Sequence, residues 1–232
     1  MDFNNLTQYF DLPIMNVLQG SDSLYMDRLM YIFTQPWPWI PMYAMLIIMI
    51  IKNNETLKQV LLVMGFAVLT VSIADIFVDV IVKPYFMRWR PTRDPFLKYS
   101  IDVVNGYRGG RFSFFSAHAT NTMSVAMFFI LLVRSRVLTV TLGLWSLLNG
   151  YTRIYMGAHF PSDVCIGFAF GAAVAAASYS LYLYFQKKIT PPRDFISTQY
   201  TSSGYAYTDV YAVILVVLLI ILYGVIRALF AI

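Results

Sequence analysis

Apolar residues form six long runs along the chain, separated by short polar stretches. Each run approaches or exceeds the ~17–25 residues that a helix needs to cross a bilayer. An open strand would leave its backbone unpaired in lipid, so helices are expected. The predicted fold class is therefore all-α, a polytopic membrane helix bundle of about six transmembrane helices. The predicted helices are residues 36–51, 59–82, 116–133, 137–155, 161–185 and 210–232.

The chain divides into four predicted parts. In residues 1–35, apolar positions alternate with acidic ones such as Asp11, a pattern typical of amphipathic helices lying at the membrane interface. A partly ordered tail is the alternative. Residues 36–185 form a membrane catalytic core of five helices, residues 186–209 a polar connecting loop, and residues 210–232 a C-terminal transmembrane helix.

Two local patterns predict how the helices are placed. Gly167, Gly171 and Ala175 recur every four residues, which lets a neighbouring helix approach closely. Trp37 and Trp39 precede the first membrane helix and are expected at the level of the lipid headgroups.

Composition excludes several classes of protein. Hydrophobic residues make up 59% of the chain and charged residues 12%, against roughly 25% charged in a soluble domain. The net charge is +5, but seven of the seventeen Lys and Arg residues lie between positions 83 and 111. This indicates one local basic site and no nucleic-acid-binding face. A single cysteine and two histidines leave little material for a metal cage, so neither a metal nor a cofactor is expected.

Polar residues that could take part in a chemical reaction concentrate at three helix ends. Six crossings place these ends on one face of the membrane. The residues are Lys83 and Arg90, then Ser116 and His118, and finally Arg153, His159 and Asp163. Any one of these cations could be an interface anchor whose head reaches water. Three cations converging on one point would repel each other, however, unless a multiply charged anion binds between them. Phosphate fits, because arginine forks and helix N-termini both bind its oxygens.

The two histidines can divide the work of phosphoryl transfer. Asp163, four residues after His159, could hold one ring nitrogen protonated and leave the other free to attack phosphorus. His118 would donate a proton to the departing oxygen and later activate water. The cations and the Ser116 hydroxyl would neutralise charge on the phosphoryl oxygens.

These stretches resemble the three signature motifs of the type 2 phosphatidic acid phosphatase (PAP2) superfamily of membrane lipid phosphatases. Lys83 and Arg90-Pro91 match the first motif, Ser116 and His118 the second, and Arg153, His159 and Asp163 the third. The resemblance implies a metal-independent phosphohistidine mechanism, with His159 as the nucleophile and His118 as the acid. It also implies a site on the periplasmic or external face of a bacterial inner membrane, with residues 186–209 cytoplasmic. Charge alone leaves this orientation open, because Lys and Arg are divided between the two faces.

The sequence departs from the family motifs at three positions. Phe115 replaces a proline, Ala117 a glycine and Thr152 a serine. Alanine is tolerated at 117 if the backbone there is helical, and the Thr152 hydroxyl could still bond to phosphate.

Other polar residues near the motifs have competing interpretations. Asp79 lies one turn before Lys83 and could position it for phosphate, or the pair could be a packing contact. Four further arginines are predicted to be interface anchors, with headgroup binding as the alternative; they are Arg88, Arg93, Arg108 and Arg111.

The predicted function is hydrolysis of a phosphate group from a membrane lipid, either lipid A-type or a glycerophospholipid monoester. An undecaprenyl pyrophosphate phosphatase, which would recycle a carrier lipid, is the enzymatic alternative. The alternative of another class is a non-catalytic protein that binds or transports an anionic lipid. The expected partners are therefore the bilayer and a lipid bearing phosphate or pyrophosphate, and no nucleic acid.

Overall fold

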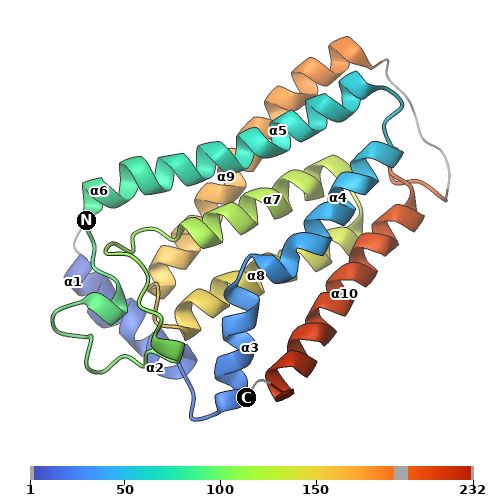
Figure 1. Cartoon of the computed structure of the whole chain (residues 1–232). Coiled ribbons are helices and arrows are strands. Elements are labelled where there is room, and N and C mark those ends of the chain that lie inside the picture. The colour runs from blue at the N-terminus through green and yellow to red at the C-terminus, as the bar shows by residue number, and fades with distance from the viewer. Residues whose placement is uncertain (1–2, 191–197, 231–232) are drawn as a thin grey trace.

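The structure, a computed structural model, describes residues 3–190 and 198–230, and within them regular secondary structure is entirely helical (Figure 1). Five long helices and one shorter helix build the bundle. Near the N-terminus lie α1 (Phe3–Leu6), the turn η1 (Thr7–Asp11), α2 (Leu12–Leu18) and α3 (Leu24–Thr34). The bundle comprises α4 (Ile40–Lys52), α5 (Leu57–Ile76), α7 (Ala117–Val133), α8 (Arg136–Tyr155), α9 (Pro161–Ile189) and α10 (Tyr207–Phe230). Helix α5 continues through η3 (Phe77–Val82) into α6 (Lys83–Phe86).

Three of the described helices are long and apolar enough to cross a membrane, namely Leu57–Phe86, Pro161–Ile189 and Tyr207–Phe230. A fourth span is possible if Leu24–Thr34 and Trp37–Lys52, which meet at a bend of 63°, count as one. The chain is thus a membrane protein with several spans. The six predicted segments all coincide with helices, but the number of crossings stays a prediction.

The predicted loop at residues 186–209 is shorter in the structure. Helix α9 runs on to Ile189 and α10 begins at Tyr207, because the alternation of polar and apolar residues near these ends still suits a helix. Residues 191–197 lie outside the described part of the chain.

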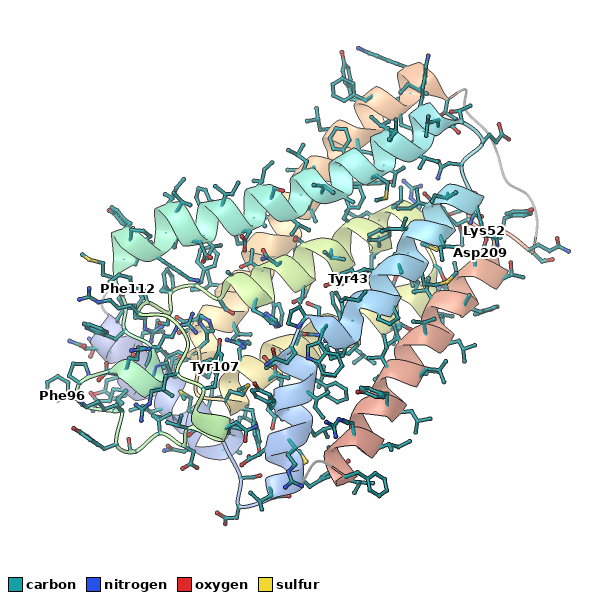
Figure 2. The ribbon with its side chains drawn as sticks, viewed as in Figure 1. Tyr43, Lys52, Phe96, Tyr107, Phe112 and Asp209 are labelled. Atoms are coloured by element: carbon teal, nitrogen blue, oxygen red, sulfur yellow. The ribbon has the colours of Figure 1, made fainter. Side chains whose placement is uncertain are left out.

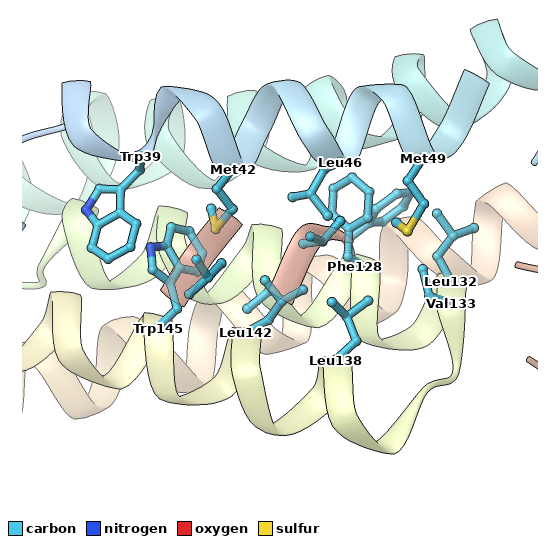
Figure 3. Close-up of a cluster of buried hydrophobic side chains, with 14 of the residues drawn as sticks. Trp39, Met42, Leu46, Met49, Phe128, Leu132, Val133, Leu138, Leu142 and Trp145 are labelled. Carbon is cyan, nitrogen blue, oxygen red and sulfur yellow. The ribbon is translucent and has the colours of Figure 1, made fainter. Parts of the chain in front are cut away.

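The main core lies between the helices of the bundle and α3, and Figure 3 shows the part of it between α4, α7 and α8. Trp39 belongs to it: its side chain is 2% exposed, and its indole N–H donates to the Phe33 carbonyl at 2.9 Å. The ring packs inside the protein because the bend before α4 turns it toward Trp145, and the expected headgroup level of Trp39 stays a prediction. Trp37 remains 47% exposed.

Helices α7 and α9 approach closely along the predicted small-residue stripe. Gly167, Gly171 and Ala175 are all buried, and the two glycines lie against the backbone of α7. This confirms the packing role of the stripe. It also fixes the N-terminus of α7, where the second motif begins, against the N-terminus of α9, where the third motif ends.

Candidate active site

The three motif stretches meet at one end of the bundle, beside the loop that joins α6 to α7 (Figure 1). Two hydrogen bonds join them. The Ser116 amide donates to the Asp163 carbonyl at 3.1 Å, and Arg90 Nη1 donates to the Ala158 carbonyl at 3.2 Å. Residues that are 47 and 68 positions apart in the chain therefore share one site.

His159 occupies the centre of this site on the turn between α8 and α9. Its amide and that of Ala158 both donate to the Arg153 carbonyl, at 3.2 and 3.0 Å. The His159 side chain is 2% exposed. Burial, reinforced by the positive charges of Arg90, Arg153 and Lys83, holds its pKa well below the ordinary value of 6.5. At neutral pH the imidazole is therefore uncharged, which is the form that can attack an electrophile.

Asp163 faces His159 but does not hydrogen-bond to it. The Nδ1 to Oδ2 distance is 3.7 Å, and Nδ1 is a buried nitrogen without a partner among the described residues. Asp163 Oδ2 instead accepts the Phe160 amide at 3.1 Å, because the first turn of α9 leaves that amide unpaired. The carboxylate thus faces the ring without a hydrogen bond, and the direct bond that the spacing suggested is not formed.

Arg90 and Arg153 are anchored by neutral groups. Arg90 donates to the carbonyls of Phe112 and Ala158, and Arg153 donates to the Thr34 hydroxyl and the Tyr107 hydroxyl, both at 2.7 Å. Within the described ranges, neither guanidinium forms an ion pair with a carboxylate. Burial lowers the pKa of Arg90, and the charge of Arg153 lowers it further. The site therefore concentrates positive charge that favours the binding of an anion.

Lys83 contributes the third cation. It pairs with Asp79 one helical turn away, so the predicted contact between the two is confirmed. Asp75, another turn earlier, accepts a hydrogen bond from Asn121 of α7 at 2.6 Å and thereby ties the two helices together.

The second motif forms the N-terminus of α7. Ser116 is the N-cap, and its hydroxyl accepts the Ala119 amide at 3.3 Å. Ala117 is the first helical residue, so the helical backbone that we required for an alanine is present. His118 Nε2 lies 3.3 Å from Asn149 Oδ1, a partner that the sequence did not reveal.

The Thr152 hydroxyl has a different place from the one expected. It is fully buried and donates to the Asn149 carbonyl at 2.7 Å, beside the Thr34 hydroxyl at 3.1 Å. A threonine hydroxyl that bonds back to its own helix is typical of helix interiors. Thr152 therefore stabilises the contact between α8 and α3, next to the bond from Arg153 to the same Thr34 hydroxyl.

Tyr107 is a site residue that sequence reasoning missed. Its hydroxyl bonds to Arg153, and the guanidinium carbon lies 5.0 Å from its ring centre. Burial would raise the pKa of Tyr107, but the charges of Arg153, Arg90 and Lys83 outweigh it and lower the pKa below 10.0. No periodicity marks this residue, because it lies in an irregular loop. Figure 2 shows Tyr107 and Phe112 at the loop end of the bundle, opposite Lys52 and Asp209.

Arg88 and Asp11 are the largest departure from the sequence prediction. Arg88 is 6% exposed and donates to Asp163 Oδ1 at 2.7 Å and to Asp11 Oδ2 at 2.6 Å. It is therefore not an interface anchor. Asp11 is fully buried, whereas the apolar Tyr9 and Val17 nearby are 75% and 81% exposed. The N-terminal segment turns its acidic residue toward the protein because Arg88 offers it a buried positive charge.

The chain is similar to characterised proteins over most of its length. The sequence profile of the PAP2 superfamily matches residues 56–187. A lipid A 4'-phosphatase of Porphyromonas gingivalis is 35% identical over 170 residues, which are 72% of this chain and 70% of that protein. A lipid A 4'-phosphatase of Bacteroides thetaiotaomicron is 35% identical over 163 residues, 69% of this chain and 72% of that protein. A solved transmembrane PAP2-type phosphatidylglycerolphosphate phosphatase from Bacillus subtilis aligns with 78% of this chain and 94% of its own, at 21% identity and a TM-score of 0.44.

Proposed function

The chain belongs to the PAP2 superfamily and is a membrane lipid phosphatase, and we propose that it removes a phosphate monoester from a lipid A-type substrate through a phosphohistidine at His159. One observation carries the proposal. A buried imidazole lies among three cations, two of which have no carboxylate partner in the described chain. That combination suits a nucleophile next to a bound phosphate.

The first step transfers the phosphoryl group to the enzyme. His159 Nδ1 faces Asp163, so Nε2 is the nitrogen left to attack phosphorus. A nitrogen–phosphorus bond forms while the bond from phosphorus to the lipid oxygen breaks. His118 gives a proton to that departing oxygen, which leaves as a hydroxyl group on the lipid.

The second step releases phosphate. His118, now unprotonated, takes a proton from water, and the resulting oxygen attacks phosphorus as the nitrogen–phosphorus bond breaks. Lys83, Arg90 and Arg153 neutralise the phosphoryl oxygens in both steps, and the first turn of α7 behind Ser116 offers further N–H donors. The products are inorganic phosphate and the dephosphorylated lipid, with His159 and His118 restored to their starting forms.

The substrate preference is supported by the two lipid A 4'-phosphatases, which match about 70% of the chain each. The test is phosphate release by the detergent-purified protein in EDTA, from lipid A, undecaprenyl pyrophosphate and phosphatidic acid, with His159→Ala as the inactive variant. We expect lipid A to be the fastest substrate and the variant to lose several orders of magnitude in rate. Faster release from undecaprenyl pyrophosphate would favour the carrier-lipid activity. Release that is unaffected in His159→Ala, or no release at all, would overturn the mechanism.

We also propose that the protein crosses the bacterial inner membrane six times, with the site on the periplasmic face. Labelling with a membrane-impermeant maleimide tests this in cells whose outer membrane has been removed. In a Cys165→Ser background, Tyr99→Cys marks the loop beside the site, and Glu55→Cys marks the opposite end of the bundle; both positions are exposed. We expect Tyr99→Cys to react in these cells before lysis and Glu55→Cys only after lysis. The reverse pattern would overturn the orientation.

A further inference from the structure

A buried ion cluster joins the N-terminal segment to the candidate active site. Arg88 lies at its centre and donates to three groups besides Asp163: Asp11 Oδ2 at 2.6 Å, the Thr7 hydroxyl at 2.7 Å and the Ser162 hydroxyl at 2.9 Å. Its guanidinium also stacks 4.0 Å from the centre of the Phe160 ring. The side chains of Arg88, Asp11 and Asp163 are at most 4% exposed.

Asp11 reaches α9 directly as well as through Arg88. Its Oδ1 accepts the Ser162 amide at 2.8 Å, and its Oδ2 accepts the Ser162 hydroxyl at 2.9 Å. The N-terminal segment therefore holds the first turn of α9, which carries Asp163. No carboxylate oxygen of Asp11 remains without a donor, so the aspartate is fixed in position.

The charges in this cluster do not balance. Two carboxylates share one guanidinium, which leaves a net charge of −1 in a buried region. Burying an uncompensated charge is costly, so the imbalance needs a positive group nearby. Arg90 in the adjacent site already interacts electrostatically with Asp163, and further positive charge can develop on His159, whose Nδ1 lies 3.7 Å from Asp163 Oδ2. When Nε2 bonds to phosphorus, the imidazole becomes cationic and its proton resides on Nδ1.

We propose that Asp11 and Arg88 are positioning residues for the reaction, an inference that rests on the proposed function of His159. Arg88 holds Oδ1 of Asp163 and so aims Oδ2 at His159. Arg88 favours the negative charge of Asp163, and Asp11 offsets the charge of Arg88, so that the three groups together keep a net negative charge beside the imidazolium that forms during phosphoryl transfer. Neither residue touches the phosphate. The N-terminal segment is therefore part of the catalytic unit and not only a membrane-surface element.

The first test is the kinetics of Asp11→Asn, with Asp22→Asn as the matched control. Asp22 lies in the same N-terminal segment but is exposed, so the same chemical change there leaves the site untouched. Because all groups that bind phosphate remain, we expect kcat to fall about tenfold or more, while KM and inhibition by inorganic phosphate change by less than about threefold. A fall in phosphate affinity with unchanged kcat would overturn the proposal.

A double-mutant cycle separates positioning from general stability. If Asp11 acts only through Asp163, then Asp11→Asn should cost little further in kcat once Asp163→Asn is present. Equal losses in both backgrounds would show a purely structural role and overturn the proposal. If Asp11→Asn does not fold, Arg88→Lys takes its place, because a lysine keeps the charge but lacks the fork that reaches both carboxylates. The same kcat-selective loss is expected, and wild-type kcat in a folded Arg88→Lys would refute the inference.

The controls also separate this inference from the proposed function. If the wild-type protein and Asp22→Asn release no phosphate from any lipid, the proposed function fails. If both release phosphate and Asp11→Asn matches them in kcat, only the positioning role fails.

Discussion

Replacing Gly167 by alanine tests whether the close contact between α7 and α9 sets the geometry of the site. A Cβ atom at this position would lie 2.8 Å from the Ser116 carbonyl oxygen, 3.1 Å from the Thr120 hydroxyl and 3.3 Å from Ala119 Cβ. The nearest of these is a backbone atom that no side-chain rotation can move. The two helices must therefore separate at this point.

The size of the shift follows from the distances. Ordinary contact begins at 3.4 Å, so the added methyl group is 3.4 − 2.8 = 0.6 Å too close to the Ser116 carbonyl. Overpacking of this kind costs ~1–3 kcal/mol of stability, or roughly 2–4 °C in Tm for each kcal/mol. Ser116 is the N-cap of the helix that carries His118, while Asp163 lies in the first turn of the facing helix. Because a displacement of about 1 Å can cost ~100-fold in rate, a shift of this size should lower kcat about tenfold.

The assay pairs thermal unfolding in detergent with phosphate release from the preferred lipid. Gly65→Ala on α5 is the matched control, because a Cβ there would meet no atom within 4 Å. Alanine is a better helix former than glycine, so this control should be as stable as the wild type or more stable, by up to ~1 kcal/mol. If Gly167→Ala equals Gly65→Ala in both Tm and kcat, the close contact does not determine the geometry of the site.

Two further predictions concern the loop that carries Gly106 and Gly109, beside Arg90, and the proposed nucleophile. Gly109→Ala should weaken inhibition by inorganic phosphate about tenfold, because its Cβ would lie 2.9 Å from Arg90 Cζ; a tenfold change corresponds to ~1.4 kcal/mol. Gly106→Ala has a similarly positive φ but no neighbour within 4 Å, so it controls for backbone strain, and equal inhibition in both variants would contradict the prediction. The second prediction concerns pH: only uncharged His159 can attack, and its pKa lies below 6.5, so kcat/KM should stay high down to pH 6.5 and fall only at lower pH. The titration of the substrate phosphate is followed by phosphorus NMR, and its contribution is subtracted from the pH profile. A fall in kcat/KM that begins at or above pH 6.5 in the corrected profile would refute the prediction.

The helices and the motif residues were predictable because both depend on local sequence. Hydropathy over a window of about 20 residues measures how well a segment suits lipid. The predicted segment at residues 161–185, for example, lies within α9 (Pro161–Ile189). The small-residue stripe was equally local, since an interval of four places Gly167 and Gly171 on one helix face. These patterns need no knowledge of what lies across the bundle.

Other parts of the site could not be predicted because they depend on contacts across long stretches of chain. Asp11 bonds to Ser162, 151 positions away, and Arg153 bonds to Thr34, 119 positions away. The alternation around Asp11 indicates only that one face is polar. It does not distinguish a face toward water from a face toward a buried arginine.

The sequence by itself determined where the helices lie, which residues could bind and attack phosphate, and which family the chain resembles. Tertiary structure alone decided how these residues are held. Asp163 is hydrogen-bonded to Arg88 and faces His159 without a bond, and the Thr152 hydroxyl donates to a carbonyl of its own helix. The physical reason is that hydropathy and motif spacing are properties of neighbouring residues. The strength of a buried charge interaction, in contrast, depends on distance and burial, which exist only after the chain has folded.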